Sequence, residues 1–219
     1  MKRSRIRGVV FDMDGVIIDS HPAHRRAWKQ FLQSMGLDAS EQELDFILDG
    51  RKREEILRHF LGDLSGEQVR EYGSRKDEML RRLGNGLHPI EGVVEFLVSV
   101  KQAGLKTAVA TSGGTTRTLG TLSDLGLTHY FDTIVTGDEV LNGKPDPGVY
   151  RLVAQRLGEN PCDLLAIEDA ASGVKAATRA GMGCIGIAPA DRAERLLAAG
   201  ARPVVRDLRG LSLADLNHM

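Results

Sequence analysis

The sequence predicts an α/β fold, in which a doubly wound, Rossmann-like parallel sheet forms the core and an α-helical cap is inserted. Two observations predict the core. Short runs of β-branched and apolar residues alternate with stretches of helical periodicity, and polar residues follow each run. A third observation predicts the insert, because residues 20–86 contain no run rich in strand-forming residues.

Five short apolar runs are the expected strands, and each of them ends at polar residues. They are residues 6–11, 107–111, 133–137, 164–169 and 183–187. The helices between and after these runs are expected at residues 90–103, 115–125, 147–157, 172–180 and 193–199, several of them closed by glycine. Strands that alternate with helices form parallel sheets, which bind ligands at the carboxyl ends of their strands. The polar side chains after the runs are therefore expected to converge.

The insert carries apolar side chains at helical spacing, for example at Trp28, Phe31 and Leu32. Because it lies between the first and second strands, we expect it to stand over the carboxyl edge of the sheet as a cap. The predicted division is a core domain of residues 1–19 and 87–219 and a helical cap domain of residues 20–86. The segments 19–22 and 85–89 are the expected hinges.

Charge and cysteine usage exclude several classes of protein. The 29 Lys and Arg residues balance 30 Asp and Glu residues, so nucleic acid is not an expected partner. Cys162 and Cys184 form no CxxC motif, and we expect two buried thiols rather than a disulfide or a zinc site. The apolar stretch after the basic residues 1–7 is too short for a signal peptide or a membrane span. We expect a cytoplasmic monomer with no membrane partner.

Two carboxylates, Asp12 and Asp14, follow the first expected strand. Alternate residues of an extended strand point to opposite faces, so a loop is needed to present both side chains to solvent or to a metal. Taken alone, this pattern is equally compatible with a turn in which the aspartates bond their own backbone.

Three further strand ends and loops favour chemistry over a simple turn. Thr111 ends the second run, Lys144 lies in a loop with prolines on its carboxyl side, and Glu168 and Asp169 end the fourth run. Together with Asp12 these offer a nucleophile, a hydroxyl, a cation and metal-binding acids. Such groups stabilise the charge that spreads over a phosphoryl group during its transfer.

The order and spacing of these motifs resemble the haloacid dehalogenase superfamily, specifically its phosphatase and phosphomutase branch with a helical cap between the first two motifs. The matching stretches are residues 11–20, 109–112, 143–147 and 167–173, and the resemblance covers nearly the whole chain. It implies cleavage of phosphate esters, because Asp14 stands where members that cleave carbon–halogen or carbon–phosphorus bonds lack an aspartate.

The resemblance also implies a catalytic role for four residues. Asp12 would attack phosphorus and form an aspartyl phosphate. Asp14 would protonate the leaving alkoxide and then take a proton from water. Thr111 and Lys144 would neutralise the phosphoryl oxygens, and Lys144 would offset repulsion among the carboxylates.

Mg²⁺ is the cofactor that the resemblance implies. Its ligands would be Asp12, the main-chain carbonyl of Asp14, Asp169 and waters, because a hard cation prefers oxygen and keeps much of its hydration. Glu168 has three open interpretations. It is a ligand through water, a partner behind the ligands, or an acid that only caps a helix or borders the core.

The substrate is expected to contact the cap and the segment after Thr111. His24, Arg53 and Lys76 are candidate binding residues, and their order is similar to the cap pattern of beta-phosphoglucomutases. Each also has a simpler interpretation, as a packing histidine or as a cation on a solvated helix face. Ser112 and Gly113 are further candidates.

The residues after Ser112 help to distinguish a phosphatase from a phosphomutase. Beta-phosphoglucomutases tend to carry Ser, Lys and Asn there to hold a second phosphate, whereas this chain has Gly113 and Gly114 followed by Thr115. The departure favours a phosphatase that acts on a small phosphorylated metabolite such as a sugar phosphate. A sugar phosphomutase of the beta-phosphoglucomutase type is the alternative.

Two interpretations outside enzymology are weaker. A receiver-type signalling module also gathers acids, Thr and Lys, but it accepts phosphate after its third strand and is a small single domain. A binding protein that has lost its activity is also conceivable on this fold, because fold does not ensure function. All the expected catalytic residue types are nevertheless present.

Overall fold

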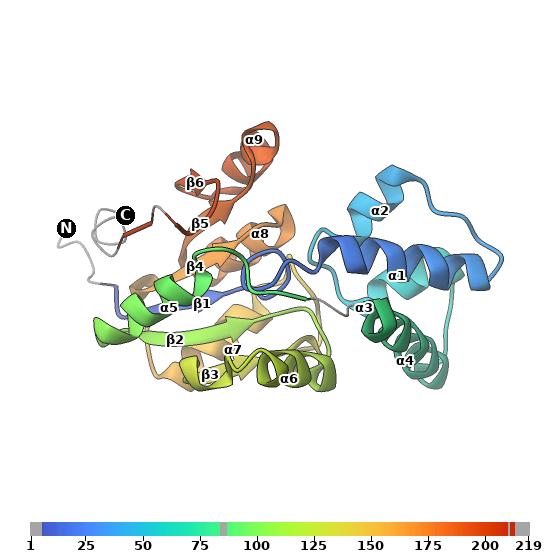
Figure 1. Cartoon of the computed structure of the whole chain (residues 1–219), viewed down its shortest axis with the longest axis horizontal. Helices are drawn as coiled ribbons and strands as arrows, with labels where there is room; N and C mark the ends of the chain where they lie inside the picture. Colours follow the sequence, from blue (N-terminus) through green and yellow to red (C-terminus); the bar gives the residue numbers. More distant parts are fainter. Residues whose placement is uncertain (1–5, 84–86, 210, 213–219) are drawn as a thin grey trace.

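A parallel sheet forms the centre of the molecule, and the computed structural model describes residues 6–83, 87–209 and 211–212 of the chain. Within these residues the sheet has six strands in the order β3-β2-β1-β4-β5-β6 (Figure 1). The strands are β1 (Gly8–Phe11), β2 (Lys106–Ala110), β3 (Thr133–Val135), β4 (Leu164–Glu168), β5 (Gly183–Ile187) and β6 (Val204–Val205). All neighbouring pairs are parallel, and β1 pairs with both β2 and β4. The predicted α/β class is confirmed.

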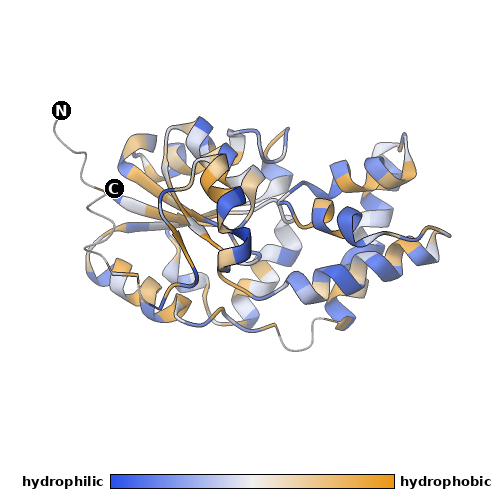
Figure 2. Cartoon of the chain, turned by 90° about the horizontal axis from the view of Figure 1, so that it is seen from above, coloured by the Kyte–Doolittle hydropathy of each residue, from blue (hydrophilic) through white to orange (hydrophobic). Residues whose placement is uncertain are grey.

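Helices cover both faces of the sheet, because alternate strand residues point to opposite sides. Val10 packs in one apolar cluster with α7 (Gly148–Leu157), α8 (Ala171–Ala180) and α9 (Ala190–Ala199). Val9 and Phe11 pack in the other, with α5 (Val93–Gln102) and α6 (Thr115–Asp124). Three short 3-10 turns complete this region: η1 (Thr128–Tyr130), η2 (Gly137–Glu139) and η3 (Pro161–Asp163). Apolar residues run along the central strands in Figure 2, as a sheet buried on both faces requires.

Four further helices lie beyond the carboxyl ends of the strands (Figure 1). They are α1 (His21–Ser34), α2 (Glu41–Ile47), α3 (Arg53–Leu61) and α4 (Gly66–Leu83). Their apolar faces form a cluster of their own, in which Trp28, Phe31 and Leu57 are fully or almost fully buried. Trp28 therefore packs in the core of these helices. Of the two expected hinges, Asn85 and Gly86 lie outside the described residues.

The loop between α2 and α3 connects these helices to the sheet-based part of the chain. The main-chain carbonyls of Asp49 and Gly50 accept hydrogen bonds from Ser172 and Ser112, the second at 2.5 Å. Lys52 donates to the carbonyl of Val140 at 2.8 Å. These contacts hold the helices close to the strand-end loops.

Some local predictions differ from the structure. β6 was not predicted, because two residues carry too little pattern to stand out. Cys184 is buried as expected, but the prediction of a buried thiol at Cys162 is wrong, since η3 carries this residue on the surface. None of the helices in the described residues combines the length and the apolar character that a bilayer span requires.

Candidate active site

Asp12 and Asp14 lie at the carboxyl end of β1, and both line one pocket. The backbone turns sharply after them, and the amide of Gly15 donates to the carbonyl of Ile18 at 2.9 Å. Gly15 has a φ of 86°, and a Cβ on it would lie 2.1 Å from Oδ2 of Asp169. Only glycine therefore allows this turn to approach the end of β4 so closely.

Lys144 lies beneath Asp12 and is almost fully buried. Its Nζ donates to Oδ1 of Asp12 at 2.6 Å, to Oε1 of Glu168 at 2.6 Å and to the carbonyl of Ala110 at 3.0 Å. Burial disfavours the charged amine, but the carboxylates of Asp12 and Glu168 outweigh it and raise the pKa of Lys144. The ammonium thus fixes the orientation of Asp12 and neutralises part of the local negative charge.

Glu168 anchors Lys144 from behind. Its Oε1 also accepts a hydrogen bond from the Tyr150 hydroxyl at 2.6 Å, and both side chains are fully buried. Tyr150 was not among the predicted site residues, because nothing in the sequence of α7 distinguishes it from a packing residue. The arrangement favours the interpretation of Glu168 as a partner behind the ligands over that of a helix cap.

Three carboxylates converge where a cation can bind. Asp12, Glu168 and Asp169 each offer one oxygen, and these atoms lie within 4.8 Å of one another. Burial, together with the charges of Asp12 and Glu168, raises the pKa of Asp169 well above its usual range. Burial also raises the pKa of Asp12 to about 7, against the opposing effect of Lys144. A largely buried all-oxygen set, whose negative charge Lys144 neutralises only in part, fits a hard divalent cation such as Mg²⁺.

Thr111 and Ser112 follow β2 on the other side of Asp12. The Thr111 hydroxyl accepts a hydrogen bond from the amide of Gly113 at 3.0 Å and faces the pocket. Ser112 also lines the pocket, but its hydroxyl donates to Gly50 of the α2–α3 loop. Ser112 therefore joins the two parts of the chain in addition to bordering the substrate space.

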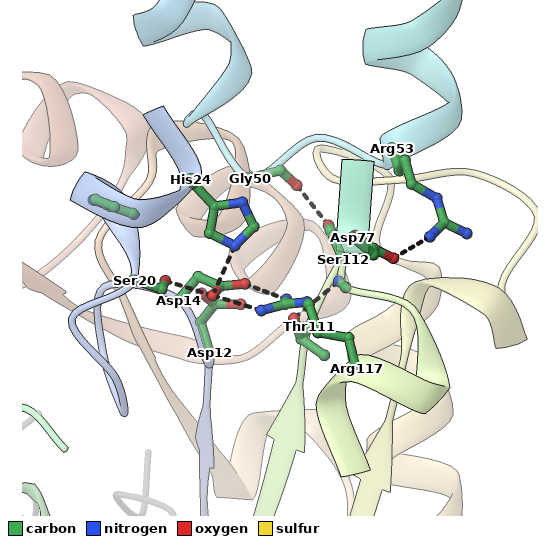
Figure 3. A network of polar contacts seen from close by, with 12 residues as sticks. Asp12, Asp14, Ser20, His24, Gly50, Arg53, Asp77, Thr111, Ser112 and Arg117 are labelled. Carbon is green, nitrogen blue, oxygen red and sulfur yellow. Dashed lines mark hydrogen bonds and ion pairs between the residues drawn. The ribbon is translucent and has the colours of Figure 1, made fainter. Parts of the chain in front are cut away.

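Asp14 is held by three side chains (Figure 3). Arg117 donates to Oδ1 at 3.0 Å and to Oδ2 at 2.5 Å, and the Ser20 hydroxyl donates to Oδ1 at 2.6 Å. His24 Nε2 lies 3.4 Å from Oδ1, which is longer than a well-formed hydrogen bond. Burial would raise the pKa of Asp14, but Arg117 and then His24 hold it well below its usual range. The carboxyl is thus a carboxylate in this arrangement.

Sequence reasoning missed Arg117. It is the third residue of α6, and its pairing with Asp14 spans 103 positions of the chain, so no local pattern announces it. The one available signal was the glycine pair at positions 113 and 114, which leaves space for a long side chain from the helix that follows.

The three candidates from α1, α3 and α4, which are His24, Arg53 and Lys76, all reach the same pocket. Lys76 is 3 % exposed, and its Nζ lies 3.2 Å from Nδ1 of His24 and 5.2 Å from the ring centre of Trp28. Burial lowers the pKa of Lys76 to about 8, and burial followed by the charge of Lys76 lowers the pKa of His24 to about 4. Because its pKa is this low, His24 is neutral, accepts a hydrogen bond from Lys76 through Nδ1 and turns its Nε2–H toward Asp14. The third candidate, Arg53, pairs with Asp77 at 2.5 Å.

The predicted site residues thus come together around Asp12. The pocket is lined by Asp12, Asp14, His24, Arg53, Lys76, Thr111, Ser112, Gly113 and Asp169. Lys144 lies directly beneath, in contact with Asp12 and with Glu168. This grouping can hold a cation, position a carboxylate nucleophile and surround an anionic substrate with positive charge.

Comparisons with known proteins agree with this chemistry. The sequence profile of the haloacid dehalogenase-like hydrolase family matches residues 9–187. The chain is 34 % identical to hexitol phosphatase A of Escherichia coli over 190 residues, which cover 85 % of this chain and 86 % of that one. It is 31 % identical to beta-phosphoglucomutase of Mycobacterium tuberculosis over 243 residues, with coverages of 94 % and 92 %. The crystal structure of beta-phosphoglucomutase from Clostridium difficile superposes with a TM-score of 0.85 at 25 % identity, covering 97 % of this chain and 96 % of that one.

Proposed function

Because the chain belongs to the haloacid dehalogenase-like hydrolases, we propose that it is a Mg²⁺-dependent phosphatase of small phosphorylated sugars or sugar alcohols. Membership of this family makes the chain an enzyme of the sugar phosphatase and phosphomutase type, and sets aside the receiver and binding-only interpretations. The observation that carries the proposal is the carboxylate of Asp12, fixed by Lys144 at 2.6 Å and open to a pocket rich in cationic side chains.

The reaction proceeds in two displacements at phosphorus. In the first, a carboxylate oxygen of Asp12 forms a bond to phosphorus while the bond to the substrate oxygen breaks, and the leaving alkoxide takes a proton from Asp14. In the second, water attacks the aspartyl phosphate and gives a proton to Asp14. The acyl–phosphate bond breaks, so inorganic phosphate leaves and Asp12 is restored.

In this structure Asp14 is in the protonation state that the second displacement requires. Arg117 and His24 favour its carboxylate form, which is the form that takes a proton from water. For the first displacement Asp14 must carry a proton, so its pairing with Arg117 has to loosen once substrate is bound. Thr111 lines the pocket and the ammonium of Lys144 contacts Asp12, so these two groups serve the oxygens of the phosphoryl group.

The metal would be held by Asp12, Asp169 and the main-chain carbonyl of Asp14. When bound, Mg²⁺ would neutralise charge on the phosphoryl oxygens and so favour attack by a carboxylate. Glu168 shares the carboxylate cluster, but its Oε1 already serves Lys144 and Tyr150. We therefore assign Glu168 to holding Lys144, with any contact to the metal made through water.

We assign substrate selection to the helices above the sheet. Residues 20–86 would form a cap domain that closes the pocket over a core of residues 1–19 and 87–219. His24, Arg53 and Lys76 reach the pocket from these helices, and Ser112 and Gly113 border it from the core. A closed cap excludes bulk water during the first displacement and so protects the aspartyl phosphate.

A sugar phosphomutase is the second candidate. It is favoured by the gathering of Arg53 and Lys76 beside neutral His24 in one pocket, since the charges of Arg53 and Lys76 suit a sugar that carries a further phosphate. In a mutase the aspartyl phosphate would pass to a second hydroxyl of the sugar rather than to water. Hydrolysis stands first because no side chain extends from Gly113 or Gly114 to hold a second phosphate.

The test is phosphate release across a panel of hexose and hexitol phosphates, with Mg²⁺ and with EDTA. The panel includes both anomers of glucose 1-phosphate with a trace of glucose 1,6-bisphosphate. Mg²⁺-dependent release of phosphate supports the phosphatase, and glucose 6-phosphate formed without phosphate release supports the mutase. Neither product on any substrate would contradict both. Gel filtration and cell fractionation test the accompanying proposal of a cytoplasmic monomer.

A further inference from the structure

Asp169 differs from the other two carboxylates of the cluster in how its side chain is held. Asp12 and Glu168 each accept a hydrogen bond from Lys144 at 2.6 Å. Within the part of the chain that the structure describes, the Asp169 side chain accepts no such bond, and its one ion-pair partner is His21. The orientation of Asp169 therefore depends on a residue to which the proposed chemistry gives no role.

The imidazole of His21 faces Asp169 across the edge of the pocket. Its Nε2 lies 3.4 Å from Oδ2 of Asp169, and the two side chains are 23 % and 12 % exposed. Both residues line the pocket. The separation is longer than a well-formed hydrogen bond, and a small rotation of the imidazole is enough to close it. The ring is thus placed to donate to this carboxylate.

The first turn of α1 holds His21 in this place. His21 is the first residue of the helix, and Ser20 before it makes no capping hydrogen bond with its side chain. The Ser20 hydroxyl instead donates to Asp14 at 2.6 Å. Pro22 follows, and its ring restricts the backbone at the start of the helix. The start of α1 is therefore fastened to the loop after β1, beside Asp169.

Gly15 leaves room for the contact. A Cβ on this residue would lie 2.1 Å from Oδ2 of Asp169 and 2.8 Å from Cε1 of His21. The space above the turn after β1 is thus shared by the imidazole and the carboxylate. Three segments far apart in the chain build the contact: the turn at Gly15, the start of α1 and the end of β4.

We propose that His21 is a positioning residue for the metal ligand Asp169. The imidazole donates its Nε2–H to Oδ2 and leaves the other carboxylate oxygen for the cation. Ligating carboxylates are commonly oriented in this way by hydrogen bonds from residues behind them, and loss of such a partner weakens metal binding. The inference rests on the proposed function for the identity of the cluster as a Mg²⁺ site.

A neutral donor suits this position better than a cation. Lys144 already brings one positive charge to the cluster through Asp12 and Glu168. A further fixed charge beside Asp169 would repel a divalent cation, whereas a neutral N–H orients the carboxylate without that repulsion. His21→Lys keeps a donor but adds a charge, so it should bind metal less tightly than His21→Gln.

Metal affinity is the test, because it is measured without substrate or turnover. The whole chain is freed of metal with EDTA, desalted and titrated with Mn²⁺ at about pH 7.5, where an ordinary imidazole is neutral. The electron paramagnetic resonance signal of free Mn²⁺ gives the dissociation constant, and competition by Mg²⁺ gives that of Mg²⁺. Asp169→Asn should remove most of the binding, which assigns the titrated ion to this site.

Three substitutions of His21 separate the donor from the ring. His21→Ala should raise the dissociation constant of the metal roughly 10- to 100-fold. His21→Gln should recover much of the affinity, because its amide nitrogen takes the place of Nε2. His21→Asn should not, because its amide nitrogen takes the place of Nδ1. His129→Ala, at an exposed histidine of η1, is the control and should bind metal as the wild type does.

Thermal unfolding distinguishes a positioning role from a merely structural one. In EDTA, His21→Ala and the wild type should unfold at similar temperatures. Mg²⁺ should raise the unfolding temperature less in His21→Ala, because stabilisation by a ligand follows its dissociation constant. A loss of stability that is the same in EDTA and in Mg²⁺ would assign His21 to the fold alone and overturn the inference.

Equal metal affinities in His21→Ala and the wild type also overturn the inference, as does a wild type that binds neither metal. Should His21→Ala fail to fold, the comparison of His21→Gln with His21→Asn decides, since equal affinities of these two contradict a donor at Nε2. A chain whose metal binding needs His21 but which releases no phosphate keeps the inference and loses the proposed function. Phosphate release with unchanged metal affinity in His21→Ala does the reverse.

Discussion

At the scale of single residues, a chain of buried hydrogen bonds fixes the orientation of the Asp12 carboxylate. Tyr150 donates to Glu168, Glu168 accepts from Lys144, and Lys144 donates to Asp12, with each of these contacts at 2.6 Å. Every member is buried, so each depends on its neighbour for its polar partner. The orientation of Asp12 therefore depends on Lys144 and, behind it, on Glu168 and Tyr150, which do not line the pocket.

Asp12→Asn should abolish phosphate release while the chain stays folded. An amide keeps the shape of the side chain but does not attack phosphorus and binds Mg²⁺ poorly, so we expect a loss of roughly 10³-fold or more in kcat. Lys144 retains Glu168 as a partner, which protects the fold. Phosphate release and circular dichroism measure the two effects. Turnover close to that of the wild type would refute the assignment of Asp12 as nucleophile.

Asp14→Asn should discriminate between leaving groups. Aryl phosphates leave without help from an acid, so p-nitrophenyl phosphate should still give a burst of one p-nitrophenolate per site and then stall at the aspartyl phosphate. Hexitol phosphates should lose roughly 10²- to 10⁴-fold in rate, the usual contribution of acid–base catalysis. Rapid-quench kinetics measures both. Equal losses for the two kinds of ester would count against Asp14 as the acid.

Tyr150→Phe should lower the free energy of unfolding by about 1–3 kcal/mol, because it removes a buried hydrogen bond to a charged group. The ring, which packs in the core and lies 5.2 Å from Lys144 Nζ, is kept. Urea unfolding followed by Trp28 fluorescence gives the change, and Tyr130→Phe is the matched control. If the variant proves as stable as wild type, the hydroxyl contributes nothing to the chain of buried hydrogen bonds.

Residues next to strand ends could be predicted from the sequence, and residues that act across the fold could not. Asp12, Thr111 and Asp169 follow recognisable apolar runs, so topology alone brings them to one edge of the sheet. Arg117 and Tyr150 sit inside helices, where arginine and tyrosine are ordinary residues. Their roles depend on partners that only the folded chain supplies.

At the scale of elements, α1 and α4 together create an unusual environment for one amine. Lys76 of α4 lies over the ring of Trp28 and against His24, both of α1. Burial lowers its pKa to about 8, with Arg117 of α6 acting in the same direction and Asp77 and Asp14 opposing. The pairing of two helices thus converts a routine lysine into a group that titrates near neutral pH.

The charge of Lys76 should make substrate binding fall on the alkaline side. Since its pKa is about 8, the amine is positive below that pH and neutral above it, so attraction for an anionic substrate is lost as pH rises. We expect kcat/KM to decline above about pH 8 in the wild type. Lys76→Arg, which keeps its charge, should remove this decline, and Lys76→Gln should be low and flat over the same range. A decline that persists in Lys76→Arg would assign it to another group.

The elements with long apolar runs were predictable, and the short or turn-bounded ones were not. The first five strands and helices α5–α9 fall close to their predicted positions. Helix α5 begins at Val93 rather than at residue 90, because a turn at Glu91 and Gly92 precedes it. β6 has only two residues, and its pairing with β5 is a tertiary property rather than a local one.

At the scale of the whole molecule, the loop between α2 and α3 and the start of α3 connect the helices α1–α4 to the strand-end loops through hydrogen bonds. Polar contacts of residues 49–55 reach the sheet-based part of the chain, among them those with Ser112, Val140, Gly143 and Ser172. The sequence indicated that a helical insert would stand over the strand ends. It could not indicate these contacts, because they join polar residues of no special pattern across distances of 62 to 123 positions.

Removing two of these contacts should favour an open arrangement. In Ser112→Ala with Ser172→Ala the carbonyls of Gly50 and Asp49 lose their donors, at a cost of about 1–3 kcal/mol for two hydrogen bonds. If the proposed cap closes over the substrate, the closed population falls and the apparent KM rises by roughly tenfold or more, since binding needs the closed form. The small-angle scattering radius should increase in the same variant, and Ser123→Ala on the exposed side of α6 should change neither quantity. A KM and a radius equal to those of the wild type would show that closure does not depend on this loop, and would move the control of water entry to the contacts of Lys52 and Glu55.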